Sequence, residues 1–144
     1  MDTRLYQDTD REACLAVFDT NLLDYFASHE RDKFSAFLQA LPGPYFVMEH
    51  NDAVVACGGY ALSSPLSARL TWGIVRREFH RQGLGRFLLL YRLRSLTRDH
   101  PAVEMVGLAT TAQAALFFES QGFRRAGTNA ENLIELIKRL TVCA

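Results

Sequence analysis

The sequence predicts an α/β fold with a single mixed, mostly antiparallel sheet flanked by helices. Segments with apolar residues at helical spacing alternate with short runs rich in β-branched and aromatic residues. Two such runs, 45–50 and 53–62, are separated only by Asn51-Asp52, which is typical of a hairpin. Because the chain has 144 residues, 49% hydrophobic and 22% charged, we expect one domain, residues 1–144, with its own core.

The N-terminal third is expected to hold a short strand and two helices. The strand is predicted over 4–8 and the first helix over 9–22. A second helix is predicted over 28–41, because Ser28 can cap it and the Pro-Gly-Pro run at 42–44 stops it. Its apolar face holds Phe34, Phe37, Leu38 and Leu41.

Beyond the hairpin, the remaining elements follow from the same patterns. They are a loop over 63–67, a strand over 68–75, a helix over 83–98, a strand over 104–110, a helix over 111–123 and a last strand over 132–140. The last run also has helical propensity, so a helix there remains an alternative.

Residues 75–98 contain seven arginines and a single carboxylate around Gly83-Leu84-Gly85. Lysine plus arginine equals aspartate plus glutamate at 16 each, so an anion site must be local, and neither nucleic acid nor a membrane is expected as a partner. The glycines fall where a helix begins, and unpaired N–H groups there carry partial positive charge. The stretch therefore predicts a site for a phosphate-like anion.

Several classes of site are disfavoured by the spacing of reactive residues. The histidines at 29, 50, 80 and 100 show no metal-ligand spacing, and no serine has a Gly-x-Ser-x-Gly context. The Gly83 motif lacks the third glycine of a dinucleotide fingerprint and the lysine of a Walker loop. We therefore expect no metal, no zinc or serine hydrolase and no Rossmann or P-loop nucleotide site.

The cysteines and the N-terminus indicate an ordinary cytoplasmic protein. Cys14, Cys57 and Cys143 are scattered, so we expect reduced, structural thiols. No basic segment followed by an apolar one opens the chain, and no apolar run approaches the roughly 20 residues that span a bilayer.

Two blocks of the sequence resemble the GNAT superfamily of acyl-CoA-dependent N-acetyltransferases. His80-Arg81-Gln82-Gly83-Leu84-Gly85 resembles the core of its motif A, Arg/Gln-x-x-Gly-x-Gly/Ala, with Val75 at the expected strand-ending valine. His80 stands where the family usually has arginine or glutamine. Residues 114–123, Ala-Ala-Leu-Phe-Phe-Glu-Ser-Gln-Gly-Phe, resemble motif B. With the order of elements, the resemblance covers nearly the whole chain.

The resemblance implies a GNAT-like fold with splayed central strands and acetyl transfer from acetyl-CoA to a primary amine by direct attack in a ternary complex. Amides of residues 81–86 would hold the pyrophosphate, and the pantetheine arm would pair with the strand ending at Val75, which splays from the strand at 103–109. The thioester would lie near residues 73–75. The implied cofactor-binding residues are Gly73, Ile74, Val75, His80, Arg81, Gln82, Gly83, Leu84, Gly85 and Arg86.

The catalytic residues remain unknown at this point. For the candidate bases, which are Glu49, Tyr60, Glu78 and His80, a structural role is the simpler interpretation. Family members commonly have a tyrosine acid four residues before the motif B glycine, where this chain has Phe118. Hydroxyls of Tyr60 or Thr111 are alternative donors, and Thr111 itself stands where the family often has asparagine.

The acceptor is a small-molecule or protein amine that the sequence does not identify. The carboxylates Asp19, Asp24, Glu30 and Asp32 would favour a cationic amine, but we interpret them first as a solvated surface, and we interpret Tyr25, Phe26, Phe34 and Phe37 as core aromatics. We likewise interpret Arg92, Arg94 and Arg98 as complements to the helix dipole.

Two other functions and one assembly remain open. A degenerate family member would bind acyl-CoA as a sensor without turnover, an alternative that Phe118 favours. Binding of nucleic acid by the Arg-rich helix is disfavoured, because the net charge of the chain is zero. A homodimer could form by pairing of strands 45–50 or 132–140 as sheet edges.

Overall fold

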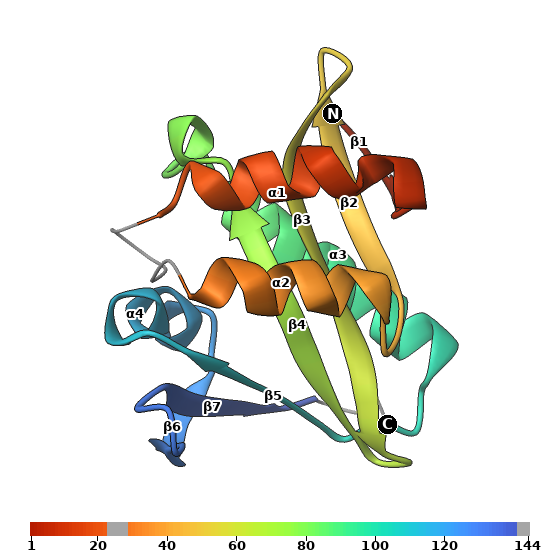
Figure 1. Cartoon of the computed structure of the whole chain (residues 1–144). Coiled ribbons are helices and arrows are strands. Elements are labelled where there is room, and N and C mark those ends of the chain that lie inside the picture. Colours follow the sequence, from red (N-terminus) through yellow and green to blue (C-terminus); the bar gives the residue numbers. More distant parts are fainter. Residues whose placement is uncertain (23–28, 141–144) are drawn as a thin grey trace.

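The computed structural model of the chain describes residues 1–22 and 29–140. In this part, one seven-stranded sheet has the order β1-β2-β3-β4-β5-β7-β6 (Figure 1). The strands are β1 (Asp2–Leu5), β2 (Tyr45–His50), β3 (Ala53–Ser64), β4 (Ser67–Val75), β5 (Met105–Thr110), β6 (Arg124–Thr128) and β7 (Ile134–Arg139). The helices are α1 (Arg11–Asp19), α2 (Glu30–Gln39), α3 (Leu84–Asp99) and α4 (Ala112–Ser120), with 3-10 turns η1 (Asp8–Asp10) and η2 (Arg77–Phe79).

The predicted fold class is confirmed. Every strand pair is antiparallel except β4 with β5, which is parallel. Helices α1 and α2 cover one face of β2–β4, and α3 covers the opposite face (Figure 1). Each face has its own apolar layer, as expected when a sheet is buried on both sides. Phe18, Phe34 and Ile74 belong to the layer under α1 and α2, and Phe46 and Leu89 to the layer under α3.

The turns between β2, β3 and β4 lie where the sequence predicts them. Asn51 and Asp52 have φ of 51° and 62°, the left-handed conformation that a two-residue hairpin turn requires and that asparagine and aspartate tolerate. The loop predicted over 63–67 is shorter than expected. β3 runs to Ser64 and β4 begins at Ser67, because serine hydroxyls bridge the two strands at the turn.

The first elements differ from the prediction at their ends. β1 covers residues 2–5 instead of 4–8, because Asp10 accepts a hydrogen bond from the Gln7 amide and closes a 3-10 turn. α1 ends at Asp19, where the predicted helix continued to residue 22. The Thr20 hydroxyl donates to the Val17 carbonyl, and such local side-chain bonds compete with helix continuation. The expected cap Ser28 lies outside the described residues.

The C-terminal part contains a strand that the sequence pattern did not predict. β6 is exposed along its whole length and so has no apolar alternation that would signal it. It pairs with β7, which confirms that the run over 132–140 forms a strand and not a helix. Since β1 and β6 are the sheet edges, β2 and β7 are both internal. The expectation that 45–50 or 132–140 could pair between subunits as free edges is therefore wrong.

No helix within the described ranges is long and apolar enough to cross a membrane.

Candidate functional site

A cleft opens where the two central strands part. β4 and β5 pair only at Ser67 with Met105, Ala68 with Val106 and Arg69 with Gly107. Beyond these pairs β4 continues to Val75 and β5 to Thr110 without bonding to each other. The cleft has a volume of about 320 Å³. It is lined by Glu30, Arg69, Leu70, Trp72, Gly73, Arg92, Leu108, Ala109, Thr110, Thr111, Phe118, Asn129, Glu131 and Leu133.

A bulge in β4 forms one wall of this cleft. The register shifts between Cys57 and Gly59, so that Gly58 lies opposite both Trp72 and Gly73. Trp72 has φ of 31°, and the buried Tyr45 hydroxyl donates to its carbonyl at 2.7 Å. This bond holds the bulge in place. Gly73 is exposed, so β4 presents bare backbone to the cleft at this point.

The N-terminus of α3 is open to an anion. Gly83 is the N-cap with φ of 83°, and no side chain caps the helix. A Cβ added at Gly83 would have no atom within 4 Å, and one at Gly85 would meet only the Phe117 ring at 3.7 Å. The first amides of α3 therefore face free space, flanked by the exposed side chains of Arg81 and Arg86. This geometry fits a pyrophosphate.

The remaining motif residues turn toward the protein. His80 Nε2 donates to the Val75 carbonyl at 2.8 Å, and the Asn21 amide donates to the same oxygen at 3.0 Å. Ile74 is buried under α1 and α2, and Leu84 packs against the core beneath α3. Of the ten predicted cofactor-binding residues, Gly73 lines the cleft. Residues 81–86 lie at the start of α3, the Val75 carbonyl accepts two side-chain hydrogen bonds, and the side chains of Ile74, His80 and Leu84 turn toward the protein.

The other candidate bases do not line the cleft. The Glu49 carboxylate accepts from Arg4 Nε at 2.6 Å. Tyr60 is buried against the His100 ring, and burial raises the pKa of its hydroxyl. Glu78 accepts from Arg76 at 2.8 Å, which lowers the pKa of its carboxyl. Structural roles are thus the better interpretation for all three.

The wall of the cleft contributed by α4 carries no free acid. The Thr111 hydroxyl accepts from the Ala114 amide at 3.3 Å and so caps α4. Phe118 lines the cleft and makes edge contacts to Phe117 and Phe123 at 5.1 and 5.6 Å between ring centroids. Phe118 therefore places a hydrocarbon ring in the cleft at the position where the sequence resemblance implies a tyrosine hydroxyl.

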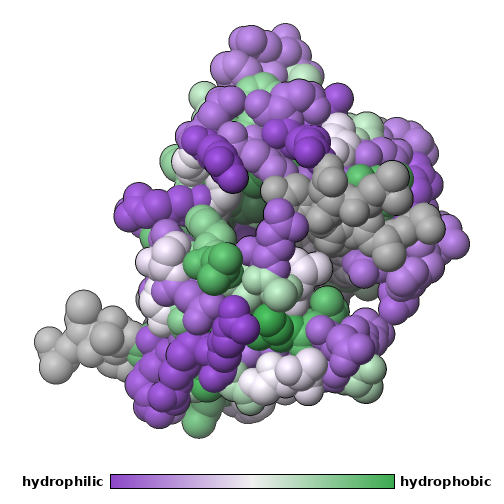
Figure 2. All heavy atoms as spheres, turned by 90° about the vertical axis from the view of Figure 1, so that its left-hand side faces the viewer, coloured by the Kyte–Doolittle hydropathy of each residue, from purple (hydrophilic) through white to green (hydrophobic). Residues whose placement is uncertain are grey.

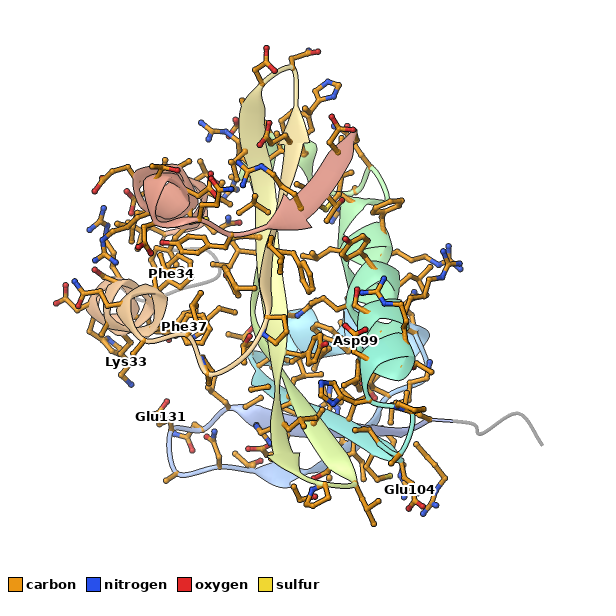
Figure 3. The ribbon with its side chains drawn as sticks, turned by 90° about the vertical axis from the view of Figure 1, so that its right-hand side faces the viewer. Lys33, Phe34, Phe37, Asp99, Glu104 and Glu131 are labelled. Atoms are coloured by element: carbon orange, nitrogen blue, oxygen red, sulfur yellow. The ribbon has the colours of Figure 1, made fainter. Side chains whose placement is uncertain are left out.

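We call the part of the cleft that Glu30 and Glu131 line its mouth, and one ion pair lies there. Glu30 at the start of α2 and Glu131 in the β6–β7 connection line it. Lys33 points from α2 toward Glu131, with their charged atoms 3.1 Å apart (Figure 3). Asp19 instead pairs with Arg31 at 2.7 Å, and Asp32 is exposed. Of the described acidic candidates, Glu30 is the one that lines the cleft.

The aromatic candidates on α2 are confirmed as core residues. Phe34 is fully buried and points from α2 to the sheet, and Phe37 packs beside it (Figure 3). Both rings contact Trp72, which is the one of these aromatics that reaches the cleft. Asp24, Tyr25 and Phe26 lie outside the described residues.

Sequence reasoning missed Arg92. The interpretation of this arginine as a complement to the helix dipole is wrong, since Arg98 and not Arg92 lies in the last turn of α3, and the exposed fraction of Arg92 is 3%. Its Nη1 donates to the Gly59 carbonyl at 3.3 Å, while its buried Nε has no partner. Burial lowers the pKa of the guanidinium to about 10, so it remains a cation at neutral pH. Its place four residues after the buried Leu88 was the available signal.

The outer surface near the cleft is mainly hydrophilic. Figure 2 faces the side of the molecule on which α4, β6 and β7 lie, and small hydrophobic patches interrupt its hydrophilic surface. The described residues contain no cluster of three or more histidine, cysteine, aspartate or glutamate side chains that could hold a metal. Cys14 and Cys57 are buried free thiols, and Cys143 lies outside the described residues.

Comparison with known families accounts for this arrangement. The family model of the GNAT acetyltransferase domain matches residues 42–125, more than half of the chain. The chain belongs to the GNAT acetyltransferase family. The match includes the bulged β4, the open N-terminus of α3 and the helix α4 with Phe118. None of the curated protein sequences matches the chain significantly.

Solved structures show the same GNAT fold over the full length. A putative GNAT acetyltransferase from Desulfovibrio desulfuricans has a TM-score of 0.80 at 19% identity, with 99% of each chain covered. The ribosomal-protein-S18-alanine N-acetyltransferase from Escherichia coli has 0.78 at 19% identity, covering 99% of this chain and 96% of that one. The PaiA N-acetyltransferase from Thermoplasma acidophilum, in complex with coenzyme A, has 0.75 at 11% identity, covering 97% and 100%.

Proposed function

We propose that residues 1–144 form one catalytic unit that transfers an acetyl group from acetyl-CoA to a primary amine. The observation that carries this proposal is the cleft between β4 and β5, where Gly73 presents bare backbone, in a chain whose helix α3 begins without a side-chain cap at Gly83. Acetylation as such is the reaction of the family to which the chain belongs. The GNAT fold of a coenzyme A complex supports the same donor.

The donor-binding residues are assigned in two groups. The amides of residues 81–86 hold the pyrophosphate, with Arg81 and Arg86 adding charge-assisted hydrogen bonds. The free edge of β4 over residues 73–75 pairs with the amide-rich pantetheine as an added strand would. His80 secures this edge through the Val75 carbonyl.

Direct transfer requires little from the side chains. Bound acetyl-CoA supplies the activated acyl group, and the bulge at Gly73 offers backbone to the thioester carbonyl. The acceptor enters from the mouth lined by Glu30 and Glu131, and the Glu30 carboxylate there favours an ammonium ion. The amine loses its proton to solvent before it attacks. Small-molecule and protein amines both fit an open mouth of this charge.

Calorimetric titration with acetyl-CoA tests the donor site. Gly83→Glu fills the free space at α3 with a negative charge, and it should abolish binding. Gly127→Glu is the matched control, because Gly127 also has positive φ and an added Cβ there also meets nothing. Gly83→Ala separates backbone strain from charge. We expect binding to the wild type and to Gly127→Glu, and weakened binding at most for Gly83→Ala.

Equal loss of binding in Gly83→Glu and Gly127→Glu, or no binding by the wild type, would contradict the donor site. Binding should also raise the free energy of unfolding of the wild type, by about 2.7 kcal/mol when the acetyl-CoA concentration is a hundred times Kd. ATP and NAD serve as negative ligands in the same titrations.

A sensor without turnover is the second candidate, because Phe118 removes the hydroxyl expected on α4. It is distinguished by transfer and not by binding. Acetyl-CoA hydrolysis or transfer should be followed with a panel of polyamines, amino acids and peptides with free N-termini. Acetylation of any amine at a rate that the Gly83→Glu variant lacks excludes the sensor, whereas donor binding without transfer across the panel supports it.

A further inference from the structure

Arg92 is a buried cation without a counterion. Among the described residues no carboxylate lies within ion-pair distance of it, and its one hydrogen bond is to the Gly59 carbonyl. Other arginines, including Arg4, Arg31, Arg69 and Arg125, pair with carboxylates. A buried unpaired charge costs stability, so a site that retains one is a candidate for function.

The guanidinium is placed against the bulge of β4. A Cβ added at Gly73 would lie 2.7 Å from Nη2, and one at Gly58 would lie 3.4 Å from Cζ. Only glycines therefore allow Arg92 to approach the strands this closely. Arg92 lines the same cleft as Gly73 and Phe118, so positive charge lies beneath the backbone at which the thioester is expected.

We propose that Arg92 stabilises the negative charge that develops on the carbonyl oxygen and then on the leaving sulfur, a task for which Phe118 has no hydroxyl. This inference rests on the proposed function. The amine nitrogen bonds to the carbonyl carbon and the oxygen takes up the electron pair. The oxygen then returns its pair to re-form the carbonyl as the carbon–sulfur bond breaks, the pair of that bond passes to sulfur, and the second amine proton goes to solvent. Both anions form close to the guanidinium, and the burial of Arg92 strengthens the attraction.

Direct docking of a substrate carboxylate on Arg92 is the less favourable interpretation. The side chain is 3% exposed, Nη1 is occupied by Gly59, and Nη2 lies against the Gly73 backbone. Such a guanidinium cannot offer the two-pronged face that carboxylates prefer. Its positive charge can instead act electrostatically, past the Gly73 backbone, on an anion that forms in the cleft.

The acidity of bound coenzyme A gives a readout that does not depend on turnover. The pKa of the thiol in the binary complex is measured from the ultraviolet absorbance of the thiolate during a pH titration. In the wild type it should fall below the ordinary thiol value of about 8.5. Arg92→Met, which removes the charge at similar volume, should raise it by about one unit or more relative to the wild type.

Arg94→Met is the matched control, since Arg94 lies in the same helix on its exposed side. It should leave the thiol pKa unchanged. Arg92→Met should fold with a melting temperature equal to or above that of the wild type, because it removes an unpaired buried charge. A lower melting temperature with an unchanged thiol pKa would mean that Arg92 is structural, and it would overturn the proposal.

Kinetics with Phe118→Tyr completes the test. Arg92→Met should lower kcat roughly tenfold or more, within the range of a lost electrostatic contact. If a cation and a proton donor serve the same leaving group, Phe118→Tyr should raise kcat more in the Arg92→Met background than in the wild type. Equal effects in the two backgrounds would contradict the proposal. So would loss of activity restricted to donors with an acyl carboxylate, such as succinyl-CoA.

The two proposals fail in different ways. If coenzyme A does not bind the wild type, the donor site itself is wrong. If it binds with the same thiol pKa in the wild type and in Arg92→Met, only the role of Arg92 is wrong.

Discussion

Two arginines of this chain meet opposite surroundings. Arg4 on β1 donates two hydrogen bonds to the Asp10 carboxylate, at 2.7 and 2.8 Å, and one to Glu49 at 2.6 Å. It ties together β1, η1 and β2 near one edge of the sheet. Arg92 is buried on α3, lines the cleft where β4 and β5 part, and has one neutral partner.

The difference shows how charge is used in the two regions. At the edge, cation and carboxylates satisfy one another, and the product is a fixed connection between elements. In the cleft, the positive charge is left without a counterion at a place where the reaction itself creates an anion. The contrast predicts that the first region controls stability and the second controls chemistry.

The largest expected effect on stability comes from Arg4→Met. It leaves the Asp10 carboxylate, whose residue is 7% exposed, without its cation, so the melting temperature should fall by on the order of 5 °C, with acetyl transfer retained. Arg125→Met is the control, because Arg125 pairs with Glu119 on the surface and such pairs contribute little. Thermal denaturation of the two variants measures this, and equal decreases in melting temperature would contradict the proposed role of Arg4 in stability.

The pH dependence of stability should also arise in the Arg4 cluster. The hydrogen bonds from Arg4 lower the pKa of Asp10 below its ordinary value of 3.8. A lowered pKa means that the stabilisation is complete above about pH 4 and is lost as the pH falls through the folded-state value. Asp10→Asn should therefore be less stable than the wild type at pH 7, with the difference shrinking toward pH 2. Urea denaturation at several pH values measures this, and a constant difference would contradict it.

The smallest effect is expected at the cleft mouth. Lys33 and Glu131 are both largely exposed, so Lys33→Met should change stability by less than about 1 kcal/mol. The substitution leaves the mouth more negative, so KM for a cationic amine should fall by about two- to threefold at low salt and return to the wild-type value at high salt. Glu131→Gln should shift KM in the opposite direction. A change in kcat alone would show that this pair does not act on acceptor entry.

The sequence alone allowed the fold class to be predicted, and it also predicts the donor site that we propose at the start of α3. Hairpin signals at Asn51-Asp52, periodic apolar residues and the Gly83-Leu84-Gly85 run are local features, and local sterics and hydrogen bonding determine their outcome. Exposed β6 escaped prediction, because it owes its place to pairing with β7 and not to an apolar pattern of its own.

Only the tertiary structure decided which polar residues face the cleft. Glu49 and Glu78 are carboxylates like Glu30 and Glu131 in the sequence, but Glu49 pairs with the distant Arg4, Glu78 pairs with Arg76 two residues before it, and neither lines the cleft. Arg92 looked like Arg94 and Arg98, and its burial depends on glycines at 58 and 73, which lie on the two strands against which its helix packs. The charge of a side chain is local, whereas its desolvation and its partners are set by residues distant in the chain, and these determine what the charge can do.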